Sequence, residues 1–337
     1  MPTIEQADQP AAEALAGAYG HAPLPGGIYA SSALPAHPPL PGIAVGHSWP
    51  AVAAAYVELT KPRIAILELV VTAAAVYLAS WGQFSWSLWW ACIIGTGLVA
   101  ASASSFNMWL ERDLDARMPR TSRRPLPAGI ISPAAALLFG WVTLLAGLAI
   151  LAAGTTLLAA ALGFLTWLSY VALYTPLKRH STSNTAIGAV AGALPVLIGW
   201  AAVGHTGTLF TAELRLWTLF LVLYIWQFPH FMAIAWLYRR DYTRVGMQML
   251  TVVDPTGHSA GVLALQTAVF FVPLASAPFL SAGAIYLVPA VAIGLAYLWL
   301  SYCFFRETTD HNARRLLRGS LVILPAWLLL LLATPLY

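Results

Sequence analysis

An amide and two carboxylates recur at intervals of four residues near the end of a long apolar stretch, at Asn107, Glu111 and Asp115. Each four-residue step along an α-helix rises about 6 Å and drifts about 40° around the axis, so an unbroken helix aligns all three on one stripe. Mg²⁺ prefers hard oxygen ligands and is commonly held by one or two carboxylates together with substrate phosphates. The stripe therefore predicts a Mg²⁺ site with Glu111 and Asp115 as ligands. Asp113 points away from the stripe on an ideal helix. It could assist by contacting the ligands rather than the metal, or it could join the site if the helix unwinds locally.

Basic residues follow this stripe and occur again after the fourth apolar stretch. Arg120, Arg123 and Arg124 come first, and Lys178 and Arg179 come later, near the polar residues Tyr170, Tyr174, Thr182 and Asn184. Acidic metal ligands beside several bases suit a polyphosphate, whose charge needs both kinds of partner. We therefore expect Arg120, Arg124, Lys178 and Arg179 to bind a diphosphate. The alternatives are a solvated loop for the acid and base mixture, and a topology signal for the Lys-Arg pair.

A third polar group interrupts the sixth apolar stretch. His230 lies about seven residues, or roughly 10 Å, inside the end of that stretch, where an ionisable side chain normally faces a cavity or a bundle interior. It could hydrogen-bond between helices, ligate a metal or transfer a proton. Gln227 and Asp241 are accessory candidates near it in sequence. Glu68, midway in the first stretch, is similarly costly in lipid, and could line a cavity or pair with a neighbouring helix.

The composition places these residues in an integral membrane protein. Hydrophobic residues make up 59% of the 337 residues and charged residues only 9%, against about a quarter charged in soluble domains. About 20 apolar residues suffice for a helix to cross a hydrocarbon core of about 30 Å. We predict an all-α fold with nine membrane-spanning helices and no nucleic-acid partner. The predicted spans are 62–80, 87–108, 132–152, 155–175, 185–203, 215–237, 259–280, 284–304 and 318–335.

The charges of the loops predict how this bundle is oriented. With a cytoplasmic amino terminus, the Lys and Arg clusters lie on the cytoplasmic side and only Arg215 lies on the other, as the positive-inside rule favours. The carboxyl terminus is then periplasmic. Residues 1–55 are rich in Ala, Pro and Gly and contain no Lys or Arg, which predicts a flexible extension before a transmembrane domain at 56–337.

The start of the chain and the cysteines indicate the compartment. The first residues have neither the Arg-rich composition of a transit peptide nor the basic start and apolar core of a secretory signal. A bacterial inner membrane is therefore the simplest location. Cys92 and Cys303 lie inside predicted spans, where they are expected to pack rather than form a disulfide or a metal site.

Several separated motifs resemble the membrane-embedded aromatic prenyltransferase superfamily and, within it, the family of heme O synthases, or protoheme IX farnesyltransferases. The superfamily motif Asn-x3-Asp-x3-Asp is similar to Asn107-x3-Glu111-x3-Asp115, and Glu111 keeps the oxygen chemistry of the Asp that it replaces. The following superfamily segment resembles Arg120 to Leu126. The segments similar to the smaller family are Thr60 to Arg63, Tyr174 to Asn184 and Trp226 to Phe231, and the resemblance covers roughly residues 56–330.

The resemblance implies transfer of a farnesyl group from farnesyl diphosphate to a vinyl group of protoheme IX (heme B). It also implies helices ringed around a central cavity that opens to the cytoplasm. Glu111 and Asp115 would hold Mg²⁺, Asn107 would orient it, and the four basic residues would hold the diphosphate. His230 would face the heme, either as an iron ligand or as a base that positions water. Heme A synthase is implied as a partner by pathway order alone.

Two other functions compete with this one. A prenyltransferase for 4-hydroxybenzoate or another aromatic acceptor would share the first acidic motif, but should carry a second carboxylate cluster after the sixth span, where only Asp241 occurs. A membrane transporter often binds its substrate near the midplane and should carry polar residues from one face to the other. Here the polar residues gather at the cytoplasmic side. Both alternatives are therefore less favoured.

Overall fold

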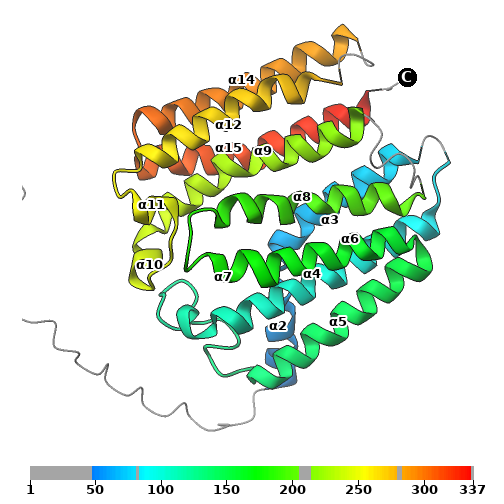
Figure 1. Ribbon diagram of the computed structural model, residues 1–337, viewed down its shortest axis with the longest axis vertical. Helices are drawn as coiled ribbons and strands as arrows, with labels where there is room; N and C mark the ends of the chain where they lie inside the picture. The colour runs from blue at the N-terminus through cyan, green and yellow to red at the C-terminus, as the bar shows by residue number, and fades with distance from the viewer. Residues whose placement is uncertain (1–47, 81–82, 205–213, 279–282, 335–337) are drawn as a thin grey trace, which may run out of the picture. The chain divides into compact units, whose positions relative to one another are not determined.

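All regular structure is helical in the computed structural model, which describes residues 48–80, 83–204, 214–278 and 283–334. Figure 1 shows how the helices are arranged. The first half contains α2 (Trp49–Leu59), α3 (Pro62–Ala79), α4 (Trp86–Asp115), α5 (Pro133–Gly154), α6 (Leu157–Leu168), the π-helical turn η2 (Ser169–Tyr174), α7 (Thr175–Leu177) and α8 (Asn184–Ala202). The second half contains α9 (Leu214–Leu237), α10 (Arg239–Arg244), α11 (Leu250–Val253), α12 (His258–Ser276), α14 (Ala284–Arg306) and α15 (Asp310–Ala333).

The prediction of an all-α membrane fold is confirmed. Within the described ranges, nine helical segments are long and apolar enough to cross a membrane. Two of them extend well beyond the predicted spans, by about two helical turns. The second span continues to Asp115 as helix α4 and the ninth begins at Asp310 as helix α15, because a helix can continue beyond the apolar residues that define its span.

Local sequence accounts for the break between the third and fourth spans, which is the hardest to place by hydropathy. α5 ends at Gly154, and the Thr156 side chain accepts a hydrogen bond from the Ala159 backbone N–H to begin α6. A Thr at this position satisfies one of the free N–H groups of a new helix. A short turn therefore separates two spans that hydropathy nearly joins.

The predicted amino-terminal extension partly falls on described residues. Residues 49–55 belong to α2, in which Ala55 and Leu59 are buried against Met108 and Leu126. The apolar run at the end of the predicted extension therefore packs as a helix on the second span. Residues 1–47 lie outside the described ranges.

Small residues allow the central helices to approach closely. α8 is the most buried candidate span, with 78% of its apolar window inside the protein, and it packs against α3, α6 and α9. A side-chain carbon on Gly199 of α8 would lie 2.6 Å from the backbone oxygen of Thr72 on α3. Small residues at such crossings let membrane helices pack backbone to backbone. At one end of the bundle, Lys61 just before α3 donates a hydrogen bond to Asn107 near the end of α4. We call this end the site end; it lies beside α10 in Figure 1.

We predict that Gly199→Ala destabilises the bundle by about 1–3 kcal/mol, because the added methyl group would have to displace the backbone of α3. The measurement is thermal unfolding of the purified protein in detergent. Gly97→Ala is the matched control, because its new carbon would meet only the Leu69 side chain at an ordinary 3.6 Å. Equal midpoints for the two variants would contradict the close approach of α8 to α3.

Candidate functional site

The acidic stripe lies on one unbroken helix. α4 runs without interruption to Asp115, and Asn107, Glu111 and Asp115 are all buried. All three line a pocket of about 150 Å³ at the site end, which we call the charged pocket. Asp113 faces outward, with 77% of its side chain exposed and its carboxylate 3.7 Å from Arg112. Because the helix does not unwind, the structure leaves Asp113 outside the pocket.

Each buried carboxylate is paired with a base from outside α4. Lys178 Nζ lies 2.9 Å from Glu111 Oε1, and Arg124 Nη1 lies 2.7 Å from Asp115 Oδ2. The loop that carries Arg124 is fixed because the Thr121 hydroxyl donates to the Asp115 backbone oxygen. The pairs compensate charges that would otherwise be costly to bury.

Lys61 is a third base in the charged pocket, and the sequence reasoning did not select it as a site residue. Its ammonium donates a hydrogen bond to Asn107 Oδ1, while Asn107 Nδ2 donates to Thr175 Oγ1 at 3.1 Å. Its backbone φ of +48° lies in the left-handed region, which is unusual for a residue other than glycine. Pro62 follows it and disfavours the right-handed helical conformation. A lysine directly before the proline that starts an apolar helix was the available signal.

The electrostatics of the lysines reflect their surroundings. Burial, followed by the nearby charge of Arg124, lowers the pKa of Lys61 to about 7, with Glu111 acting in the opposite direction. Burial would also lower the pKa of Lys178, but the Glu111 carboxylate outweighs it and holds that pKa above its ordinary value. Lys178 is therefore a fixed positive charge at neutral pH.

The charged pocket has an excess of bases over acids. It is lined by Lys61, Arg120, Arg124 and Lys178 against Glu111 and Asp115. The excess positive charge suits an anion with several negative oxygens. Arg120 also lies with its guanidinium carbon 4.4 Å from the centre of the Tyr238 ring.

A π-helical turn places two tyrosines beside these charges. Tyr170 and Tyr174 both lie on η2, and their ring centres are 5.1 Å apart. Lys178 Nζ lies 4.5 Å from the Tyr174 ring centre. Pro176 cannot donate to the carbonyl four residues before it and would clash there. The helix widens just before that proline, and widened turns of this kind are frequent at functional sites.

A second, more apolar pocket of about 200 Å³ continues from the charged one, and we call it the deep pocket. Lys61, Ile64, Tyr170 and Tyr174 line both. The other residues that line it are Glu68, Val99, Ala100, Ala103, Ser104, Thr166, Gly188, Ala191, Gly192, Gln227 and Phe231. An elongated molecule with a charged head and an apolar tail would fit the two pockets together.

The donor set fits a hard divalent cation. Asp115 Oδ1 is buried and has no hydrogen-bond partner in the described part of the chain, while Oδ2 accepts from Arg124. No cluster of three or more His, Cys, Asp or Glu side chains that could hold a metal occurs among the described residues. Two carboxylates are nonetheless what Mg²⁺ commonly takes from a protein, because water and phosphate supply its other ligands.

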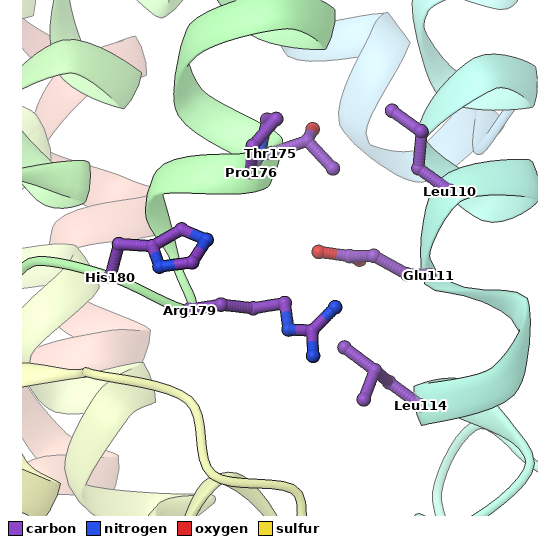
Figure 2. Close-up of a pocket in the computed structure, with 7 residues that line it drawn as sticks. All are labelled: Leu110, Glu111, Leu114, Thr175, Pro176, Arg179 and His180. Atoms are coloured by element: carbon purple, nitrogen blue, oxygen red, sulfur yellow. The ribbon is translucent and has the colours of Figure 1, made fainter.

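The adjacent bases Lys178 and Arg179, which were both expected to bind the diphosphate, line different pockets. Lys178 lines the charged pocket, whereas Arg179 lines a flanking pocket of about 140 Å³ between α4 and α7. Figure 2 shows Glu111 and Arg179 facing each other across this flanking pocket, with His180 beyond. Glu111 lines both pockets. Successive residues in the turn after α7 point in different directions, so only Lys178 lines the same pocket as Asp115.

Comparison with known proteins identifies the family. The sequence profile of the UbiA prenyltransferase family matches residues 69–332. The chain belongs to the UbiA prenyltransferase family. It is 42% identical over 284 residues to the protoheme IX farnesyltransferase of Rhodopirellula baltica, covering 82% of this chain and 98% of that protein.

Solved structures share the fold at low sequence identity. One, described as digeranylgeranylglyceryl phosphate synthase, has a TM-score of 0.68 at 16% identity and covers 83% of this chain and 97% of its own. A UbiA homologue from Archaeoglobus fulgidus bound to DMAPP and Mg²⁺ has a TM-score of 0.60 at 16% identity, covering 82% and 99%. The predicted superfamily resemblance is confirmed, and membership of an enzyme family excludes the transporter alternative.

In this UbiA-family chain, the segment after the sixth span lines the charged pocket, but the carboxylate of Asp241 does not. Asp241 does not line the charged or the deep pocket; its neighbour Tyr242 lines the charged pocket with Met247 and Met249. Asn184 holds that segment in place, since its Nδ2 donates to the Gln248 backbone oxygen at 3.0 Å. The Gln248 N–H in turn donates to the Lys178 backbone oxygen at 2.6 Å.

Gln227 and His230, the polar residues of the sixth span, also lie in different surroundings. Gln227 lines the deep pocket, and its side-chain amide nitrogen Nε2 donates to the Ala189 and Leu223 carbonyls. His230 lines neither the charged nor the deep pocket. Its Nδ1 lies 2.8 Å from the Ser320 hydroxyl, and its ring stacks on Trp226. The structure therefore gives His230 the interhelical hydrogen bond that the sequence left as one alternative.

We predict that the adjacent bases Lys178 and Arg179 differ in their effect on binding of inorganic diphosphate in the presence of Mg²⁺. Lys178→Met should weaken binding at least tenfold, about 1.4 kcal/mol, because it removes a charge from the pocket. Arg179→Met, at an exposed position outside that pocket, should weaken it by no more than about threefold, or roughly 0.6 kcal/mol. Titration calorimetry measures both, and equal losses would contradict the division between pockets.

Proposed function

We propose that this chain transfers a farnesyl group from farnesyl diphosphate to a vinyl group of protoheme IX, giving heme O. The choice of acceptor rests on one observation, the 42% identity to a protoheme IX farnesyltransferase along 98% of that relative's length. The chemistry rests on the site, where paired carboxylates and excess bases lie beside an apolar pocket.

The site residues would bind the head of the prenyl donor. Glu111 and Asp115 would hold Mg²⁺, and the unpartnered Oδ1 of Asp115 supports this assignment. The bound ion would supply Lewis-acid stabilisation of the negative charge that develops on the leaving diphosphate. The homologue bound to DMAPP and Mg²⁺ supports the same pairing of donor and metal.

The basic residues would stabilise the departing diphosphate. Lys61, Arg120, Arg124 and Lys178 converge on the charged pocket, so these basic groups are in position before the carbon–oxygen bond breaks. Preorganised charge of this kind lowers a barrier without reorganisation during the reaction. Asn107 is already held between Lys61 and Thr175 by hydrogen bonds. It would therefore orient the Mg²⁺ from a fixed position during the reaction. Arg179 would reach the diphosphate only from the flanking pocket.

The deep pocket would receive the start of the isoprenoid chain. Its walls include Val99, Ala103, Ala191 and Phe231, and an apolar wall keeps bulk solvent away from an allylic cation until the acceptor attacks. Tyr170 and Tyr174 lie where the two pockets meet. The cation would therefore form between the tyrosine rings and the charged groups.

We propose heme B as the acceptor. His230 stays a proposed heme-facing residue, as an iron ligand, because only its Nδ1 is engaged with Ser320 and the Nε2 atom of an imidazole can also ligate a metal. Heme A synthase stays a proposed partner, because it would use the product.

The bundle would lie in a bacterial inner membrane, with a cytoplasmic amino terminus and a periplasmic carboxyl terminus. The site end carries Arg120, Arg124, Lys178 and Arg239. The excess of Lys and Arg on cytoplasmic loops then supports a cytoplasmic site end. A water-soluble prenyl diphosphate head group would enter from that side.

We predict that the purified protein with heme B, farnesyl diphosphate and Mg²⁺ yields heme O, detected by mass spectrometry. Removal of the metal by a chelator should lower the rate at least about 100-fold, since several kcal/mol of charge stabilisation is lost and each 1.36 kcal/mol is tenfold. Added Mg²⁺ should restore the rate. Prenylation of 4-hydroxybenzoate without heme O would contradict the proposed acceptor and favour the aromatic alternative.

A further inference from the structure

Glu68 is an ionisable residue of the deep pocket that the binding of diphosphate does not use. It lies on α3 seven residues after Lys61, roughly 10 Å further along the helix axis, and it lines only the deep pocket of the two. In the described residues, Glu111 and Asp115 each have a basic partner within 2.9 Å, but no ion pair includes Glu68. It is therefore not explained as half of an interhelical ion pair.

A carboxyl group is costly in the wall of a pocket that has only to hold an isoprenoid chain. Ionisable side chains inside a membrane bundle are expensive and usually mark a functional path. The lining of the deep pocket includes small and apolar residues such as Val99, Ala100 and Ala103. An alanine or leucine would hold the chain at lower cost, so the carboxyl group needs a chemical role.

Polar groups in the same pocket could hold a water molecule beside Glu68. Gln227 reaches the pocket from α9, and Ser104 reaches it from α4. Because the Gln227 nitrogen is engaged by two backbone carbonyls, its amide oxygen remains as an acceptor. Gly192 makes room for this oxygen, since a side-chain carbon there would overlap it. An enclosed water needs two to four polar partners, and these side chains provide them.

The proposed reaction requires such a water after the new carbon–carbon bond has formed. The π electrons of the heme vinyl group bond to C1 of the farnesyl cation, while the diphosphate leaves with the electrons of its carbon–oxygen bond. The positive charge is then on the vinyl carbon next to the porphyrin ring. Water adds its oxygen there and must lose one proton, which completes the hydroxyethylfarnesyl group.

We infer that Glu68 is the base that accepts the proton from this water, with Gln227 Oε1 accepting the second hydrogen of the same water as a hydrogen bond. The inference rests on the proposed function and replaces His230 in the water-positioning role. His230 is engaged with Ser320 and lies outside the deep pocket, whereas Glu68 lines it. The proton then passes to solvent through the charged pocket.

The test is the product distribution of Glu68→Gln with heme B, farnesyl diphosphate and Mg²⁺. Diphosphate release should stay within about threefold of the original protein, while heme O formation should fall by roughly 100-fold, in the range of general-base effects. Mass spectrometry should detect a farnesylated heme lighter by one water molecule, because the cation loses a carbon-bound proton instead. Glu58→Gln is the matched control, since Glu58 is exposed on α2, and it should leave both readouts unchanged.

The remaining outcomes are decisive. Unchanged heme O formation by Glu68→Gln overturns the inference, and so does equal loss of diphosphate release and heme O in a folded variant. If Glu68→Gln does not fold, Glu68→Asp keeps the charge but withdraws it by one methylene group. It should raise the dehydrated fraction of the product, and an unchanged fraction overturns the inference. Failure of the original protein to farnesylate heme is a separate result, which contradicts the proposed function itself.

Discussion

The structure depends on two buried carboxylates that one helix presents to bases from other segments. α4 supplies Glu111 and Asp115, the turn after α7 supplies Lys178, and the loop after α4 supplies Arg124. A buried ion pair contributes little net stability, but loss of one partner leaves an unpaired charge that is costly. The pairs therefore fix where these segments lie at the site end. Asp115 Oδ1 remains without a partner, and that oxygen is available for a metal ion.

Close helix packing and irregular backbone bring the other groups to this point. Gly188 on α8 leaves room for the Tyr174 ring, since a side-chain carbon there would lie 2.7 Å from it. The π-helical turn then places Tyr170 and Tyr174 at the junction of the two pockets. The same bundle thus holds a charged pocket beside an apolar one. A substrate with a polyanionic head and a hydrocarbon tail fits that contrast.

Sequence periodicity predicted the parts of the site that lie on one helix. The four-residue spacing of Asn107, Glu111 and Asp115 was sufficient, because spacing alone sets the face of a regular helix. It could not divide Lys178 from Arg179, whose directions depend on the turn after Pro176. It also missed Lys61 and Tyr242, since each reaches the pocket through contacts between distant segments. The charge of Asp241 favours it as a site residue, but the backbone brings its neighbour Tyr242 to the pocket instead.

The most direct measurement of the central claim is the Mg²⁺ dependence of diphosphate release from farnesyl diphosphate in the double variant Glu111→Gln, Asp115→Asn. Asp113→Asn is the control, since it removes an exposed carboxylate from the same helix. The double variant should lose Mg²⁺-dependent release by at least about 100-fold, or roughly 2.7 kcal/mol, while the control keeps it. If the double variant retains both its turnover and its metal dependence, the two carboxylates do not hold the metal and the account is wrong.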